Sequence, residues 1–315
     1  MERDNEFGFT TTKFELKEDY EGRVEATLLS RKSKKFSRNA ILYVHGFIDY
    51  FFQLELADWA NRIGYNFYAL DLRKCGRSIL PHQKPYNFRD YKEYYEELDL
   101  AVDFIRSKEK NSFMVLMGHS TGGLISALYA NDKASDNSIN ALILNSPFVE
   151  LNASDIVNKT VSPILAFIGR IFPNMVSPVK LEEGYAMSVH KDNYGEWEFD
   201  IKLKPINGFK IYFGWINGIY TAQRILQKGL HINCPVLVLH SSKSVKTGKY
   251  NDEMQTADAV LNIAHMERYA PGLGAKVKIV TIIDGKHDLI LSNEEPRRKT
   301  YNKMRYFIEK VTPKK

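Results

Sequence analysis

The residues that decide the fold are Gly118-His119-Ser120-Thr121-Gly122. The five residues before them, 113–117, are all apolar and have the length of a buried strand, and the segment 123–130 after them has the composition of a helix. A serine on a sharp turn between a strand and a helix has its hydroxyl raised above the sheet edge, and small residues two places away on either side let the turn close. The start of the helix supplies backbone N–H groups and a positive dipole end for an oxyanion. This pattern predicts that Ser120 is a nucleophile.

Segments of strand and helix character alternate on both sides of this elbow. Strands are predicted at residues 12–17, 23–31, 40–44, 66–70, 113–117, 141–144, 236–239 and 276–282, and helices at 51–63, 91–107, 123–130 and 263–269. The first two strands are expected to form an antiparallel pair, and the later ones are continuously apolar, which is typical of strands buried on both faces. We therefore expect an α/β fold with a mostly parallel central sheet and helices on both faces.

The alternation stops after Pro147 and resumes near residue 232. Between these points the chain is rich in Pro, Phe, Tyr and Trp and shows no strand–helix rhythm. We expect residues 1–147 and 232–315 to form the two parts of the α/β core, and residues 148–231 to form an inserted cap, or lid, over the ends of the strands.

The composition narrows the class of protein and its partners. The 315 residues are 44% hydrophobic and 12% aromatic, which suits one large core. No run of eighteen apolar residues predicts a transmembrane helix, and the charged start lacks the apolar region of a secretory signal, so a cytoplasmic location is expected. Cys75 and Cys234 give neither a metal spacing nor a disulfide framework. The net charge of +6 is mild, and the basic runs lack interleaved aromatic residues. We expect no nucleic-acid partner, no metal and no cofactor.

A serine hydroxyl is a poor nucleophile without a base, and the base needs an acid to orient it. Of the eight histidines, His287 fits best, because it follows the last predicted strand in a loop that contains a glycine. The order Ser…Asp…His is also the order found on sheets of this kind. No carboxylate directly follows the strand 236–239. Asp258, which lies shortly before the predicted helix 263–269, is favoured as the acid, and Asp252 is the alternative.

Two backbone donors must hold the oxyanion of the tetrahedral intermediate. The N–H of Thr121, directly after the nucleophile, is the first. The N–H of Phe47, in the loop after the strand 40–44, is the second, and His45-Gly46 before it allows a close approach of the backbone.

Taken together, these motifs resemble the α/β-hydrolase fold over most of the chain. The branch that they resemble groups monoacylglycerol lipases, lysophospholipases and so-called serine aminopeptidases. The matching pieces are His45-Gly46-Phe47, Asp49-Tyr50-Phe51-Phe52, Asp71-Leu72-Arg73, Gly76-Arg77-Ser78, Gly118–Gly123 and Gly285-Lys286-His287-Asp288-Leu289. Within this branch the chain is similar to bacterial members with Ser-x-x-Ser after the strand and a later Asp-x-Val-Leu, here Asp258–Leu261. This similarity implies Asp258 as the acid, whereas monoacylglycerol lipases carry the acid at the strand end, where this chain has Lys243.

The cap contains two long apolar segments, 156–172 and 209–226. They are compatible with helices that pack on the core, with the wall of an acyl-chain pocket, or with a lid that touches a membrane. The substrate-binding candidates are Tyr50, Phe51, His119, Phe167 and Trp215, of which His119 is the variable position of the elbow motif. The carboxylates of the cap are scattered, which argues against a site for a substrate ammonium.

The sequence as a whole predicts a serine hydrolase that cleaves carboxylic esters with an apolar acyl group through an acyl-enzyme on Ser120. The substrate is expected to be a small-molecule or lipid-like ester, with transient contact to a membrane surface left open. A serine aminopeptidase-type peptidase, an acyltransferase and a catalytically silent binding module on the same fold are the alternatives. The oligomeric state cannot be read from the sequence.

Overall fold

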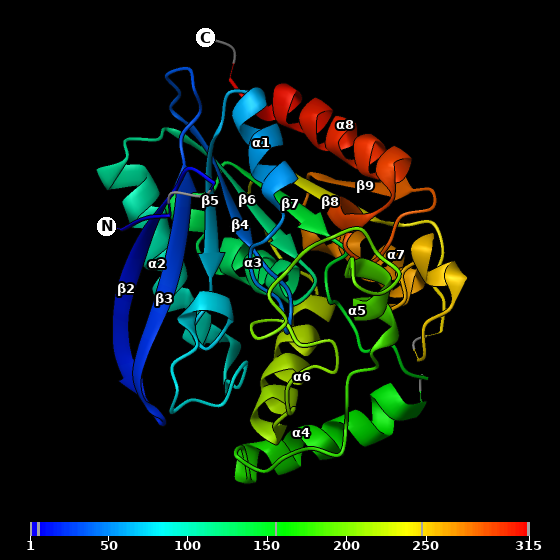
Figure 1. Cartoon of the computed structure of the whole chain (residues 1–315). Coiled ribbons are helices and arrows are strands. Elements are labelled where there is room, and N and C mark those ends of the chain that lie inside the picture. Colours follow the sequence, from blue (N-terminus) through cyan, green and yellow to red (C-terminus); the bar gives the residue numbers. More distant parts are fainter. Residues whose placement is uncertain (1, 5–6, 155, 247, 314–315) are drawn as a thin grey trace.

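One nine-stranded sheet runs through the protein, in the order β1-β2-β3-β5-β4-β6-β7-β8-β9 (Figure 1). The computed structural model describes residues 2–4, 7–154, 156–246 and 248–313. The strands are β1 Glu2–Asp4, β2 Phe9–Asp19, β3 Gly22–Arg31, β4 Asn39–Val44, β5 Asn66–Asp71, β6 Phe113–His119, β7 Ala141–Asn145, β8 Val236–Ser241 and β9 Val277–Ile282.

The sheet is parallel from β5 to β9 along this order and antiparallel at the β1–β3 edge. This confirms the predicted opening pair and the mostly parallel sheet. The carboxyl ends of the parallel strands therefore meet at one edge, where open α/β sheets bind their ligands.

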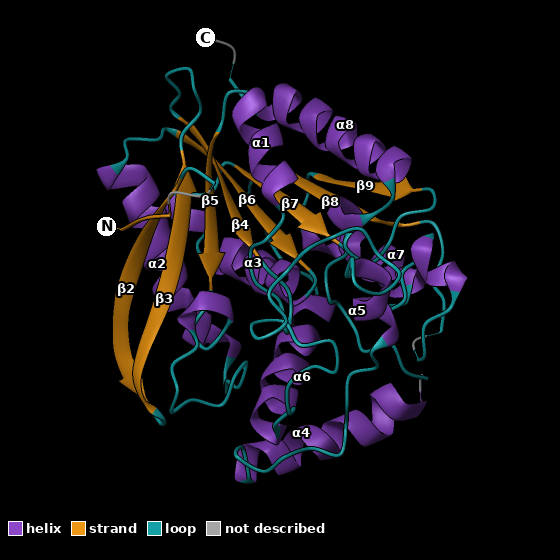
Figure 2. Cartoon of the chain, in the orientation of Figure 1, coloured by secondary structure: helices purple, strands orange, loops and turns teal. Residues whose placement is uncertain are grey.

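Helices cover both faces of the sheet (Figures 1 and 2). They are α1 Leu54–Arg62, α2 Tyr95–Asp103, α3 Thr121–Asp132, α4 Ser162–Ile171, α5 Gly184–Val189, α6 Phe213–Gln227, α7 Ile263–Tyr269 and α8 Glu294–Val311. α1 and α8 bury their apolar sides on one face, and α2, α3, α6 and α7 bury theirs on the other. The predicted α/β class with helices on both faces is confirmed.

Strand β4 shows why its sequence is continuously apolar. Ile41 and Tyr43 belong to the core under α1 and α8, whereas Leu42 and Val44 belong to the core under α2, α3 and α6. Successive side chains of a strand point to opposite faces, so a strand covered on both sides needs apolar residues at every position. Each such side chain contributes about 1.5–3 kcal/mol when it is fully buried.

The segment predicted to be a cap, residues 148–231, is built of parts with different surroundings. α6 contributes Ile219, Ala222 and Leu226 to the same core as α3, so it belongs to the helical layer over the sheet. α4 lies beyond α6, on the side away from the sheet (Figure 1). The two helices pack so closely that a Cβ at Gly169 would lie 2.0 Å from the carbonyl oxygen of Phe213.

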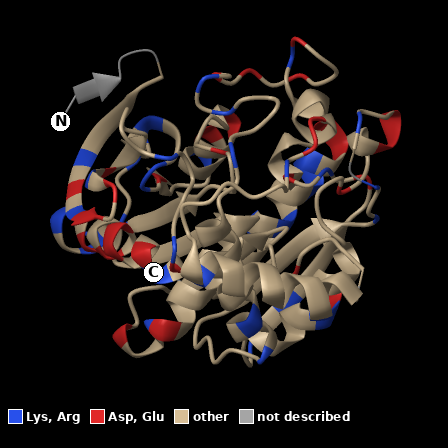
Figure 3. Cartoon of the chain, turned by 90° about the horizontal axis from the view of Figure 1, so that it is seen from below, with Lys and Arg blue, Asp and Glu red and all other residues tan. Residues whose placement is uncertain are grey.

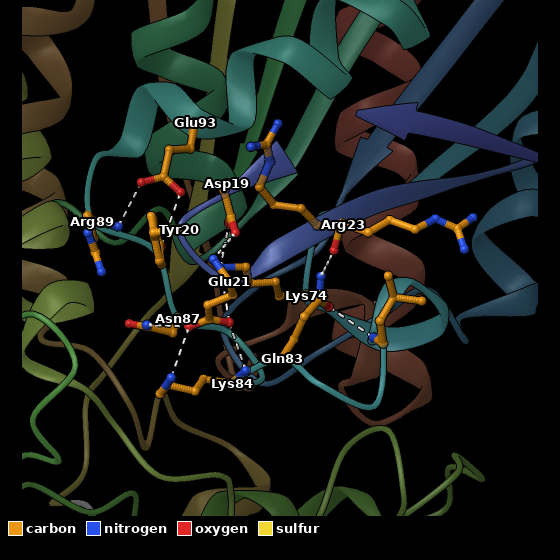
Figure 4. A network of polar contacts seen from close by, with 12 residues as sticks. Asp19, Tyr20, Glu21, Arg23, Lys74, Gln83, Lys84, Asn87, Arg89 and Glu93 are labelled. Carbon is orange, nitrogen blue, oxygen red and sulfur yellow. Dashed lines mark hydrogen bonds and ion pairs between the residues drawn. The ribbon is translucent and has the colours of Figure 1, made fainter. Parts of the chain in front are cut away.

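The tip of the β2–β3 hairpin is held by a buried ionic network (Figure 4). Lys74 is fully buried, and its Nζ lies 2.6 Å from Asp19 Oδ2 and 3.3 Å from Glu21 Oε2. Tyr20 donates its hydroxyl proton to Glu93 Oε2 at 3.3 Å. A buried ammonium is tolerated when carboxylates pair with it. This network fastens the edge hairpin to the loop that follows β5.

Charge is spread rather than gathered on the side seen in Figure 3, where basic and acidic residues are interspersed. Within the described ranges, no helix has the length and apolar character needed to cross a membrane. In the same ranges, no group of three or more His, Cys, Asp and Glu residues is placed to hold a metal ion.

The packing of α3 on β4 leads to a first prediction. A Cβ at Gly122 would lie 2.2 Å from the carbonyl oxygen of His45 and 2.5 Å from that of Val44. We expect Gly122→Ala to lower the free energy of unfolding by about 1–3 kcal/mol, because the helix must move away from the strand. Urea unfolding measures this loss. Gly272→Ala is the control, since its Cβ would meet nothing closer than 3.7 Å. Equal stability of the two variants would contradict the prediction.

Candidate active site

Ser120 forms the sharp turn between β6 and α3. Its backbone has φ 51° and ψ −116°, a conformation that is strained for a residue with a side chain. Hydrogen bonds hold the strained turn: the N–H of Ser120 donates to the Asn145 carbonyl at 3.0 Å, and its own carbonyl accepts from the N–H of Leu124 and of Phe148. A Cβ at Gly118 would lie 2.4 Å from the Gly122 carbonyl oxygen, so the turn closes only with glycine there. The strand–turn–helix elbow is as the sequence predicts.

His287 and Asp258 form a buried pair. Nδ1 of His287 lies 2.9 Å from Oδ2 of Asp258, and the two side chains are 3% and 0% exposed. The other carboxylate oxygen of Asp258 accepts hydrogen bonds from the N–H of Val260 at 2.9 Å and of Leu261 at 2.7 Å. Backbone donors therefore fix the carboxylate, and the carboxylate fixes the orientation of the imidazole.

The chain reaches Asp258 by an excursion that starts and ends beside β8. The N–H of Asp258 donates to the Lys243 carbonyl at 2.9 Å, and the N–H of Val245 donates to the Asp258 carbonyl at 2.9 Å. Asp258 also pairs with Ser244 as an isolated parallel bridge. The carboxylate thus stands next to the strand end although it comes fifteen residues after Lys243. The alternative acid, Asp252, is exposed, and its carboxylate accepts a hydrogen bond from the Tyr250 hydroxyl instead.

Asn145, at the end of β7, connects the elbow to the loop of His287. Its carbonyl accepts the N–H of Ser120, and its side chain donates to Asp288 Oδ1 at 2.6 Å and accepts from the N–H of Leu289 at 3.2 Å. Gln53 donates to the other oxygen of Asp288 at 3.2 Å. Sequence analysis assigned no role to Asn145 or Gln53, although a polar residue at the end of an apolar strand, as at Asn145, was a usable signal.

A cavity of about 240 Å³ opens above Ser120. It is lined mainly by apolar side chains, and Ser120, His287, Phe47 and Thr121 all face it. Its apolar wall includes Ile48, Phe148, Leu181, Tyr185, Ile206 and Trp215. The two residues predicted to supply oxyanion donors are therefore on the same cavity as the serine and the histidine.

Comparison with known protein families matches residues 36–262 to the family described as serine aminopeptidase, S33. This match covers most of the chain. The protein is a member of the S33 family.

Individual relatives of this S33 member are lipases. The chain is 25% identical to monoacylglycerol lipase of Mycolicibacterium smegmatis over 209 residues, which cover 65% of this chain and 70% of the relative. It is 27% identical to monoglyceride lipase of Saccharomyces cerevisiae over 143 residues, 44% of each protein. A crystal structure of a soluble variant of the yeast enzyme superposes with a TM-score of 0.70 and 19% identity, covering 97% of both chains. This structural likeness shows that the S33 member has the α/β-hydrolase fold.

Two of the five predicted pocket residues, His119 and Trp215, line the cavity of the S33 member. Burial lowers the pKa of His119 below its ordinary value, so this ring is neutral at neutral pH. The other three predicted residues do not line this cavity. Phe51 is buried against Phe9 and Phe67 in the core between the sheet and helices α1 and α8.

Tyr50 and Phe167 also lie outside the cavity. The Tyr50 hydroxyl accepts the N–H of Asp200, which holds the ring among cap residues. Phe167 is 61% exposed on α4. Loop residues such as Leu181 and Ile206 line the cavity in their place, and they carry no helical or strand period that a sequence could reveal.

One polar pair also faces the cavity. Nζ of Lys204 lies 2.6 Å from Oδ1 of Asp49, and both side chains are buried. Burial opposes the ionisation of Asp49, but the charge of Lys204 and its hydrogen bond to the carboxylate outweigh burial and lower the pKa of Asp49 below its ordinary value. The carboxylate is therefore charged and already neutralised by its partner.

Proposed function

We propose that this S33 member hydrolyses carboxylic esters with an apolar acyl group, through a triad of Ser120, His287 and Asp258. The observation that carries the proposal is the buried Asp258–His287 pair, whose histidine lines the same cavity as a serine in a strained elbow. The lipase names of the relatives support the same class of reaction.

The proposed reaction has two halves. Ser120 Oγ attacks the ester carbonyl while His287 takes its proton, and the amide N–H groups of Phe47 and Thr121 hold the oxyanion. The intermediate collapses to an acyl-enzyme as His287 gives the proton to the leaving alcohol. His287 then takes a proton from water, whose oxygen attacks the acyl carbon, and returns it to Ser120 as the acid leaves. Asp258 stabilises the imidazolium in both halves.

The charges around the cavity favour an ester over an N-terminal peptide as the substrate. A peptidase would need a free carboxylate to bind the substrate ammonium. Asp49 is neutralised by Lys204, and Glu182, which also lines the cavity, is exposed to solvent. The predominantly apolar wall suits an acyl chain, because each buried methylene contributes about 0.8 kcal/mol.

The triad is tested by labelling with a fluorophosphonate probe and mass spectrometry. We expect labelling at Ser120, none in Ser120→Ala, and a rate roughly a thousandfold lower in Asp258→Asn, because the imidazole then loses its orientation and its counter-charge. Asp252→Asn is the matched control and should label at the wild-type rate. Normal labelling of Asp258→Asn, or failure of Asp252→Asn, would refute the assignment of the acid.

The substrate class is tested with a series of p-nitrophenyl esters and a set of aminoacyl arylamides. We expect kcat/KM to rise about fourfold per added methylene until the cavity is filled, and the arylamides to be poor substrates. Trp215→Ala should flatten the dependence on chain length, because it removes part of the apolar wall. Ser120→Ala gives the background rate. A preference for the arylamides would favour the peptidase alternative.

We propose in addition that α4 contacts the lipid surface from which such substrates come. Large apolar side chains are more than one-third exposed along this segment: Val161, Ile164, Phe167, Ile171 and Phe172. An exposed apolar patch of this kind marks a surface that binds a membrane or another protein.

This proposal predicts that Phe167→Ser weakens binding to vesicles of phosphatidylcholine and phosphatidylglycerol by about fivefold, because half-burying a phenylalanine contributes about 1 kcal/mol. Co-sedimentation measures the bound fraction. Hydrolysis of a short soluble ester should not change. Phe36→Ser is the matched control, since Phe36 is 85% exposed but lies in the loop between β3 and β4. Equal losses in both variants would remove α4 from the lipid contact.

A further inference from the structure

The short helix α5 of the cap is attached to the loop that carries the histidine. We call residues 283–288 the histidine loop. The Tyr185 hydroxyl accepts the N–H of Asp288 at 3.1 Å, and the Tyr185 ring packs edge-on against the His287 ring at 5.5 Å. Lys286 reaches back to the same helix, where its Nζ donates to the Ser188 carbonyl at 2.7 Å. The histidine is thus bracketed by two contacts to α5.

The same helix is attached to the excursion that leads to Asp258, which we call the acid loop, residues 242–257. Gln255 donates its side-chain amide to the Ser188 carbonyl at 3.2 Å and to the Tyr194 carbonyl at 2.9 Å. The N–H of Gly184 donates to the Gly248 carbonyl at 3.0 Å. The Ser188 carbonyl therefore receives one donor from the histidine loop and one from the acid loop.

Lys286 is an unusual donor for this position. Its side chain is buried, and among the described residues no carboxylate lies within ion-pair distance of its Nζ. Burial lowers the pKa of Lys286 to about 8, while Glu196 raises it and Arg297 lowers it further. An ammonium held by a backbone carbonyl costs stability, because its charge is desolvated without a partner of opposite sign.

We propose that Lys286 and Gln255 are positioning residues, which share the Ser188 carbonyl and so hold the histidine loop and the acid loop in the register that brings His287 to Asp258. The inference rests on the proposed function of this pair. It assigns to α5 the role of a fixed support for catalysis. Neither residue lines the cavity, so they act on the reaction through His287 and Asp258 and not through the substrate.

The expected kinetic effect follows from geometry. Misplacing a catalytic group by about 1 Å costs roughly a hundredfold in rate. Losing one of two donors to the Ser188 carbonyl allows part of such a shift. We expect Lys286→Met to lower kcat at least tenfold on a short soluble ester, with KM within twofold of the wild type.

Stability separates a positioning role from a structural one. Lys286→Met removes a buried charge and leaves the Ser188 carbonyl with its Gln255 donor, so we expect its Tm at pH 7 to be no lower than that of the wild type. Any advantage in Tm should shrink as the pH rises above about 8. Above that pH the folded wild type has lost the proton of Lys286, whereas the unfolded wild type still keeps it. A further rise in pH therefore stabilises the wild type, and it has no such effect on Lys286→Met, which lacks the titrating group.

The experiment compares the wild type, Lys286→Met, Gln255→Leu and the double variant, with Lys278→Met as the control for loss of an exposed lysine on β9. Gln255→Leu tests the joint from the acid loop if Lys286→Met does not fold. Because both donors act through one carbonyl, we expect the losses in kcat of the two single variants not to multiply in the double variant.

Three outcomes would overturn the inference: an unchanged kcat in Lys286→Met, a fall in kcat that occurs only together with a fall in Tm, or losses that multiply in the double variant. These outcomes are separable from failure of the proposed function. If the wild type is labelled at Ser120 and hydrolyses esters while Lys286→Met matches it, the inference alone is wrong. If the wild type is no more active than Ser120→Ala, both are wrong.

Discussion

The geometry of the candidate site depends on the buried residue Asn145, through the hydrogen bonds of its backbone carbonyl and of its side-chain amide. The carbonyl holds the backbone of Ser120 in its strained turn, and the amide holds Asp288 and Leu289 beside the histidine. A buried polar group must find its partners inside the protein. Because Asn145 finds them on two different loops, the end of β7 fixes Ser120 relative to the loop of His287, the proposed nucleophile and base.

Much of this arrangement could be predicted from the sequence. The sheet, the elbow at Ser120 and the place of His287 follow from apolar periodicity and from the order of the motifs. Asp258 was harder, because no carboxylate follows β8 and only a backbone bridge to Ser244 brings it there. Phe51 could not be assigned to the core from its neighbours, since the side chains of a loop have no fixed period. Trp215 could be predicted because it lies in a long apolar segment that forms a helix. The loop residues that complete the cavity wall follow no periodic pattern in the sequence and could not be predicted.

The segment predicted to be a cap is not one structural unit. α6 is part of the layer that covers the sheet, α5 is bound to the two loops of the Asp258–His287 pair, and α4 presents an apolar face outward. The cavity lies where α5 and α6 meet the sheet edge, so its walls come from these helices and from loops, whereas Ser120 directly follows the end of a strand. The ion pair of Lys204 with Asp49 joins the two at the cavity wall.

The bridge between Ser244 and Asp258 also bears on how such a site can change over evolutionary time. Asp258, the proposed acid, is held where the acid loop starts and ends, so the number of residues in the loop has little influence on where the carboxylate lies. Closing a loop of twice the length costs only about 0.6 kcal/mol more. Insertions or deletions between the two bridge residues would therefore shift the sequence position of the acid and leave its place beside the histidine intact. A sequence alignment that relies on spacing alone would then miss the residue equivalent to Asp258, although its position in the structure would be unchanged.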